Sequence, residues 1–87
     1  MGRAAEKLLE RMRATPHGWS EDDFRGLYVG FGFEYQAGAK HSLFIHPAHQ
    51  HLRTTVPRHA NLAPAYARIA VALIDRLHKE EKGDGKR

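Results

Sequence analysis

Three short segments with strand character follow one another at residues 31–57, which read FGFEYQAGAKHSLFIHPAHQHLRTTVP. In residues 31–35 aromatic side chains alternate with Gly and Glu, and this two-residue period is typical of a strand. Residues 40–45 and 51–56 predict a second and a third strand. Residues 46–50 predict a connection between them, because they include a proline, which lacks the amide donor of a central strand. The short links favour an antiparallel meander.

Helical periodicity flanks this meander on both sides. Residues 3–15 place apolar side chains at helical spacing, and a Pro and a Gly end that helix. A second helix is expected after Ser20, an N-cap followed by three acids, and is expected to end at Gly30. The last helix is expected to be capped by Asn61 and to end at about Lys79. Its apolar stripe comprises Leu62, Tyr66, Ile69, Ala70, Leu73 and Leu77.

The order helix, helix, three strands, helix predicts an α+β fold in a single domain. We expect the second and last helices to lie side by side on one face of a three-stranded antiparallel sheet. An α-β-β-β-α core over about residues 20–79, with an added N-terminal helix at about 3–15, is the arrangement of the double-stranded-RNA-binding domain. The domain is predicted to span residues 1–79, and the charged residues 80–87 are predicted to be a disordered tail.

The carboxylates are unevenly distributed along this chain of net charge +4. Residues 35–74 contain no Asp or Glu, but they hold five of the histidines and the cations Lys40, Arg53, Arg58 and Arg68. Cations without competing carboxylates attract phosphate, so we expect a polyanionic partner, above all RNA. The alternative is that this segment is ordinary solvated surface. The chain has no cysteine and no membrane-spanning apolar run, and the cytoplasm is the expected compartment.

His41 begins the second predicted strand and is the candidate reactive group. Strand alternation puts it on the same face as Leu43 and Ile45. If Phe44, on the opposite face, joins the core, His41 lies on the open face of the sheet. There a histidine, with an ordinary pKa of about 6.5, can take the proton from an RNA 2′-hydroxyl, so that this oxygen attacks the adjacent phosphorus. The alternative is an ordinary surface histidine.

Several cationic side chains are candidates to bind phosphate near His41. They are Lys40, Arg53, Arg58 and His59. A reaction with these groups needs neither a metal ion nor a cofactor, which agrees with the missing carboxylates. For His59, the preferred second histidine, the alternative is a bond to exposed amides of the helix that follows.

A second group of imidazoles lies at His46, His49 and His51. Three imidazoles within six residues can bind zinc, nickel or copper, which would make the chain a metal-responsive interaction protein. No neighbouring carboxylate or cysteine in the sequence completes such a site. We therefore expect solvated loop residues here and predict no metal site.

Two motifs precede the last helix: AKHSLFIHP at residues 39–47 and TTVPRH at residues 54–59. Together with the helix at residues 62–77, they resemble the HicA family of toxin mRNA interferases. Members of that family begin the second strand with Gly-Ser-His and an apolar pair, followed by Val-Pro-x-His and a closing helix. The resemblance covers about residues 21–77.

The resemblance implies the toxin of a type II toxin–antitoxin system, a metal-independent endoribonuclease that cleaves mRNA and is neutralised by a HicB-type antitoxin. The catalytic histidine of the family falls on His41, as general base, and the histidine of Val-Pro-x-His falls on His59. Gly-Ser is replaced here by Ala39 and Lys40, with a glycine at Gly38 instead. If this change removes activity, the alternative is a non-catalytic RNA-binding module of the same fold.

Overall fold

The computed structural model describes residues 3–85, with side chains described for residues 3–82. Its elements are α1 (Arg3–Ala14), α2 (Glu21–Gly30), β1 (Glu34–Ala37), β2 (His41–His46), β3 (His49–Pro57) and α3 (Pro64–Gly85). The three strands form one antiparallel sheet in the order β1-β2-β3. The α+β class and the predicted order of elements are confirmed.

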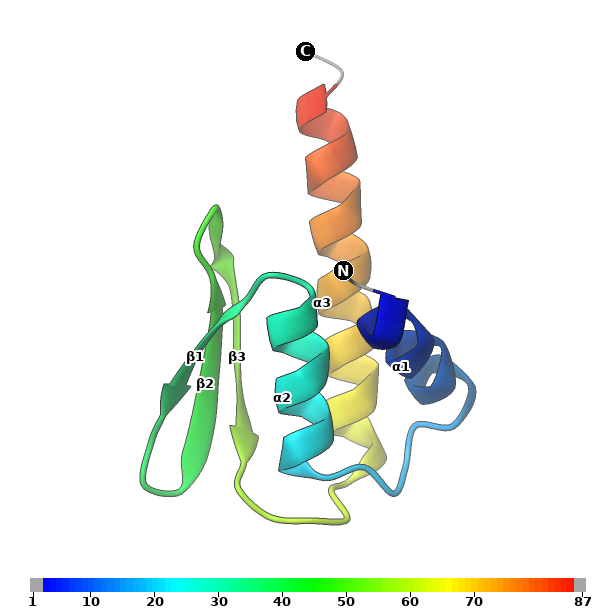
Figure 1. The fold of residues 1–87 in the computed structure, drawn as a ribbon, viewed down its shortest axis with the longest axis vertical. Coiled ribbons are helices and arrows are strands. Elements are labelled where there is room, and N and C mark those ends of the chain that lie inside the picture. Colours follow the sequence, from blue (N-terminus) through cyan, green and yellow to red (C-terminus); the bar gives the residue numbers. More distant parts are fainter. Residues whose placement is uncertain (1–2, 86–87) are drawn as a thin grey trace.

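The helices gather on one side of the sheet (Figure 1). Helix α2 contacts β1 and β3, and α3 contacts β3. Helix α1 packs against both of these helices on the side away from the sheet, which adds a layer to the core. The opposite face of the sheet carries no described helix (Figure 1), so side chains that alternate toward it face solvent.

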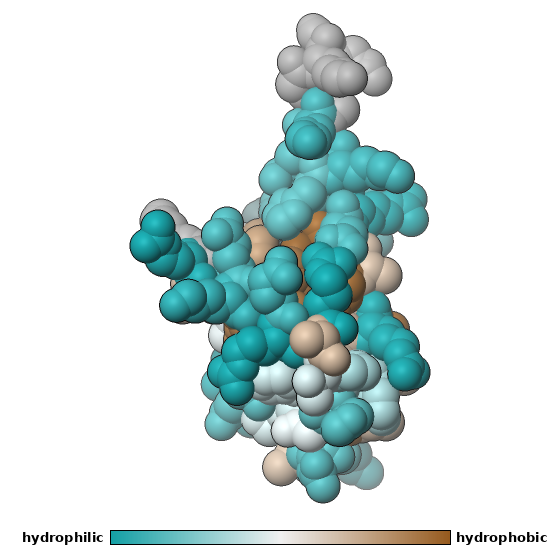
Figure 2. Space-filling view, turned by 90° about the vertical axis from the view of Figure 1, so that its right-hand side faces the viewer, coloured by the Kyte–Doolittle hydropathy of each residue, from teal (hydrophilic) through white to brown (hydrophobic). Residues whose placement is uncertain are grey.

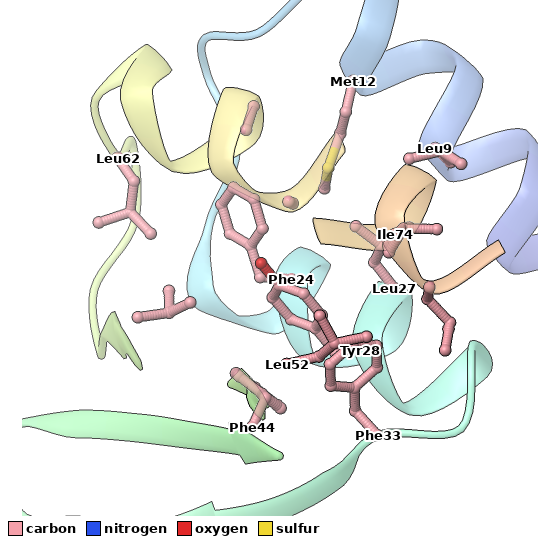
Figure 3. Packing of buried hydrophobic residues seen from close by; sticks show 14 residues of the cluster. Leu9, Met12, Phe24, Leu27, Tyr28, Phe33, Phe44, Leu52, Leu62 and Ile74 are labelled. Atoms are coloured by element: carbon pink, nitrogen blue, oxygen red, sulfur yellow. The ribbon is translucent and has the colours of Figure 1, made fainter. Parts of the chain in front are cut away.

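Aromatic and aliphatic side chains from every layer meet in one core (Figure 3). The rings of Phe44 in β2 and Tyr28 in α2 are stacked with centroids 4.8 Å apart. Phe44 and Leu27 are fully buried, and Met12 brings α1 into the same cluster. Seen from the α1 side, the surface is mostly hydrophilic, with an apolar strip between charged side chains (Figure 2).

The first strand begins three residues later than the alternation of residues 31–35 predicts. Phe31 is the C-cap of α2, and its amide bonds carbonyls of the last helical turn. Gly32 adopts a left-handed φ of 94°, and the amide of buried Phe33 also bonds a carbonyl of α2. These aromatic residues therefore complete the helix end, where unpaired carbonyls need donors, and Glu34 is the first residue of the sheet.

The beginning of α3 and one of its core positions also differ from the prediction. The helix begins at Pro64, and Asn61 has a φ of 58° in the preceding loop, so Asn61 is not its N-cap. Ile69, expected in the apolar stripe, is 45% exposed, whereas Ala67 and Ile74 are buried. The buried stripe is rotated because α3 is covered by both α1 and the sheet.

The predicted disordered tail at residues 80–87 is wrong for most of its length. Helix α3 continues through Gly85; the remaining two residues of the predicted tail lie outside the described part of the chain. Glu80 accepts a hydrogen bond from Arg76, one helical turn earlier, at 3.2 Å. It also pairs with His51 of β3 at 2.8 Å. Glu80, at the beginning of this extension, thus has partners both in its own helix and in the sheet.

Candidate functional site

His41 is exposed at the first position of β2, as alternation predicts. Ser42 and Phe44 lie on the opposite face of β2, and both are fully buried against the helices. Leu43 and Ile45 are partly exposed on the same face as His41. The packing of Phe44 thus fixes the orientation of the strand, and with it the outward position of His41.

The turn between β1 and β2 explains the glycine at position 38. The amide of Gly38 donates to the carbonyl of His41 at 2.9 Å and closes the turn. A Cβ atom on Gly38 would lie 2.5 Å from that same carbonyl oxygen, closer than non-bonded atoms approach. A glycine is therefore required here by the hairpin itself. Ala39 and Lys40 lie exposed at the tip of the turn.

Two cations lie beside His41 at this end of the sheet. The amide of Arg58 donates to the carbonyl of Lys40 at 3.1 Å, immediately after the last paired residue of β3. The guanidinium of Arg58 donates to the carbonyl of Gly38 at 2.8 Å. Both cationic side chains are exposed, and that of Arg58 is held over the turn. The geometry therefore groups Lys40, His41 and Arg58.

His59 lies at the same end of the molecule but does not bond amides of the helix that follows it. Its imidazole is exposed, with Nδ1 3.3 Å from the carbonyl oxygen of Ala60. Its own carbonyl accepts the amide of Glu21, the first residue of α2, at 3.2 Å. The backbone of His59 is thus tied to the N-terminus of α2, while its ring remains available at the surface.

Arg53 is not brought together with this group. It pairs with Ile45 across the sheet, whereas His41 pairs with Pro57. Four residues of extended strand separate Arg53 from Pro57, which corresponds to about 14 Å along the strand. Its Nε atom donates to the carbonyl of Gln50, near the opposite end of β3. Arg53 can contact a long polyanion that crosses the open face, but not the same phosphate as Arg58.

A buried carboxylate lies directly behind the candidate site and was not singled out from the sequence. Glu21 is 6% exposed, and it accepts hydrogen bonds from the hydroxyl of Ser42 at 2.6 Å and from Arg25 at 2.8 and 3.2 Å. Burial raises the pKa of Glu21, but the bonds from Arg25 and Ser42 and the charges of Arg25 and Arg58 outweigh burial, so the pKa lies below its ordinary value. The available signal was Ser42 itself, because a hydroxyl on the core face of a strand needs a partner.

The other three histidines of the carboxylate-free segment occupy the other end of the sheet. His46 is buried at 7% exposure, and its Nδ1 accepts the amide of Ala48 at 3.2 Å. Burial, followed by the charge of His49, lowers the pKa of His46. His49 and His51 both belong to β3 and pair with the carboxylate of Glu80 at 3.3 and 2.8 Å. The expectation of a solvated loop is wrong, because α3 reaches this hairpin and brings an acid to it.

The fold brings carboxylates from other segments close to the carboxylate-free segment. Glu21 and Asp22 line a shallow hollow with Arg58 and His59, and Glu80 lies beside two histidines. Within residues 3–82, no group of three or more His, Cys, Asp or Glu side chains has a geometry that could hold a metal ion. None of the described helices combines the length and apolar character needed to cross a bilayer.

No family model matches this chain, and neither a curated protein nor a solved structure matches it. The fold and the site themselves define a small α+β domain with one open sheet face. At one end of that face an exposed histidine lies next to two exposed cations, and a buried carboxylate lies behind it.

Proposed function

We propose that the protein is a metal-independent endoribonuclease of the HicA toxin kind, with a double-stranded-RNA-binding-domain-like fold and His41 as general base. The observation that carries the proposal is the grouping of exposed His41 with Lys40 and Arg58 on the open end of the sheet. Because the site faces solvent and is not enclosed, it suits a long chain such as mRNA.

In the proposed reaction the His41 imidazole takes the proton of an RNA 2′-hydroxyl. The 2′-oxygen then attacks the adjacent phosphorus, and the bond from phosphorus to the 5′-oxygen breaks. The leaving 5′-oxygen receives a proton from a general acid, for which His59 is the candidate at this end of the fold. The products are a 2′,3′-cyclic phosphate and a 5′-hydroxyl. Lys40 and Arg58 stabilise the negative charge that develops on the non-bridging oxygens.

The partly exposed Leu43 and Ile45 follow His41 along the same face of β2. Apolar side chains beside a cationic site would otherwise be in contact with water, so they suit a protein partner that covers the site. The proposed partner is a HicB-type antitoxin, which would exclude RNA by occupying this face.

The test is induced expression of the wild type and of His41→Ala, with His17→Ala as a matched control that removes an exposed histidine far from the sheet. The wild type and His17→Ala are expected to arrest growth and deplete bulk mRNA, and His41→Ala is expected to do neither. The purified wild type should produce cyclic-phosphate ends in the presence of EDTA. Unchanged growth and intact mRNA with all three forms would overturn the nuclease proposal.

A non-catalytic RNA-binding module of the same fold is the second candidate. It is favoured by the replacement of Gly-Ser by Ala39 and Lys40 immediately before His41. Such a module would bind RNA with an affinity that falls steeply as salt concentration rises, without cleavage products. The purified protein distinguishes the two candidates in a single experiment with labelled RNA.

A further inference from the structure

Glu21 contacts both chain segments that carry the candidate site. Its side chain accepts the hydroxyl of Ser42, the residue that follows His41 in β2. Its backbone amide donates to the carbonyl of His59 in the segment after β3. One residue of α2 is therefore bonded to the beginning of one strand and to the chain that leaves the next.

The network extends from Glu21 to β1 through Arg25. The Arg25 guanidinium bonds the Glu21 carboxylate and lies 4.5 Å from the centroid of the Tyr35 ring in β1. That ring in turn contacts Phe44 of β2, with centroids 5.6 Å apart. The carboxylate, the guanidinium and the aromatic ring thus hold α2 against β1 and β2, while the backbone amide of Glu21 holds the segment that follows β3.

We propose that Glu21 is a positioning residue, which fixes the His41 end of β2 and the Arg58–His59 segment relative to each other. Its effect on catalysis rests on the proposed function, whereas its effect on the position of His41 does not. A buried hydroxyl that lost its acceptor would be costly, so the Ser42 hydroxyl holds the strand at one register and one distance from α2. The imidazole one residue away is then held in a defined place.

Substitutions of Glu21 and Ser42 separate the effect of the charge from that of the hydroxyl contact. Glu21→Gln keeps the shape and one acceptor oxygen, but it can no longer pair as an anion with Arg25 or attract Arg58. Arg25, whose side chain is 38% exposed, would lose the anion that holds it beside the Tyr35 ring, so the neighbouring groups are expected to rearrange. Ser42→Ala removes the other end of the same contact and should act in the same direction.

The experiment compares full-length Glu21→Gln and Ser42→Ala with Asp22→Asn. Asp22 neighbours Glu21 and lies 3.7 Å from the same arginine, but its side chain is 87% exposed. NMR spectra of the His41 imidazole are recorded, and RNA cleavage is measured in parallel. Glu21→Gln and Ser42→Ala are expected to shift the His41 resonances, and Asp22→Asn to leave them unchanged. A folded core is verified from the resonances of Phe44 and Tyr28.

The kinetic expectation is a decrease of kcat by roughly ten- to hundredfold with KM changed little, because a misplaced base affects the reaction more than binding. Unchanged His41 resonances in folded Glu21→Gln would overturn the positioning role, whatever the activity. Shifted resonances in a protein whose wild type does not cleave RNA would support the positioning role and overturn only the proposed nuclease function.

Discussion

Single residues set the geometry of the β1–β2 turn, and Gly38 has the narrowest tolerance among them. The carbonyl of His41 occupies the place where a side chain at position 38 would begin. The turn cannot widen without losing the bond between the Gly38 amide and that carbonyl. A glycine is thus required at position 38 by steric contact with the backbone of the turn, whether or not RNA approaches it.

We predict that Gly38→Ala destabilises the protein by about 1–3 kcal/mol, because the new methyl group overlaps with backbone atoms. Urea unfolding monitored by Trp19 fluorescence measures the change. Gly26→Ala is the matched control: it lies within α2 with nothing near the added Cβ, and should stabilise the protein by up to about 1 kcal/mol. Equal stability of Gly38→Ala and the wild type would show that the turn adapts.

At the scale of elements, the C-terminal half of α3 is joined to the β2–β3 hairpin by charged side chains. Glu80 receives one bond from its own helix, from Arg76, and two contacts from β3, from His49 and His51. The hydrogen bond from His51 has the largest effect and lowers the pKa of Glu80; burial opposes it, but the hydrogen bond from Arg76 and the charges of His51 and Arg76 also lower the pKa. Glu81 only approaches His49, at 4.0 Å.

We predict that Glu80→Gln loosens the last turns of α3, because the pairing of both β3 histidines depends on this one carboxylate. Amide hydrogen exchange should become severalfold faster in residues 76–85 and at the hairpin, while the core of α2 exchanges as before. Glu81→Gln, which removes only the longer contact, should change exchange little. Equal exchange rates in both variants would mean that helix propensity alone maintains the end of α3.

At the scale of the whole molecule, the carboxylate-free segment is divided between two ends of the sheet. The end with His41, Lys40 and Arg58 keeps its cations exposed. At the other end His46 is buried and its neighbours pair with an acid of α3. A charge pattern that is continuous along the chain therefore produces one cationic surface and one histidine cluster that is paired with a carboxylate.

This division predicts a two-stage loss of stability as the pH falls. The pKa of His46 is lowered from 6.5, so the unfolded chain takes up this proton first, and stability declines from about pH 6.5 downward. Glu21 and Asp75, whose carboxylate accepts two hydrogen bonds from Arg13 of α1, have pKa values below their ordinary 4.5 and 3.8. Their contributions to stability therefore hold above these values and are lost at lower pH. Urea unfolding midpoints across this pH range measure both stages.

His46→Asn separates the two stages, because an amide oxygen can replace Nδ1 as acceptor for the Ala48 amide without titrating near neutral pH. The variant should lose the decline that begins near neutral pH and keep the acidic one. His17→Asn, at an exposed position, should retain both. A profile for His46→Asn that parallels the wild type would assign the first stage to another group.

The α+β class, the order of the six elements and the faces of β2 follow from the sequence alone. Local periodicity determines these features, since apolar residues two or three to four positions apart must share a face. The same periodicity predicted that Phe44 and His41 lie on opposite faces of the strand, and the burial of Phe44 leaves His41 outward. The later beginning of the first strand did not follow from the sequence, because Phe31 is the C-cap of α2 and bonds carbonyls of its last turn. The length of α3 did not follow either, and its residue Glu80 pairs with a histidine that is distant in the sequence.

Only the tertiary structure decided which charged and polar groups meet. Sequence distance does not show that Glu21 lies under Ser42, that Glu80 reaches His51, or that Arg53 lies far from Arg58. Such pairs depend on how strands and helices cross, whereas the division of a strand into two faces depends only on alternation within it. The sequence by itself therefore determined that His41 and Phe44 lie on opposite faces of one strand. The folded chain buried Phe44 against the helices, which left His41 exposed, and it determined what surrounds His41.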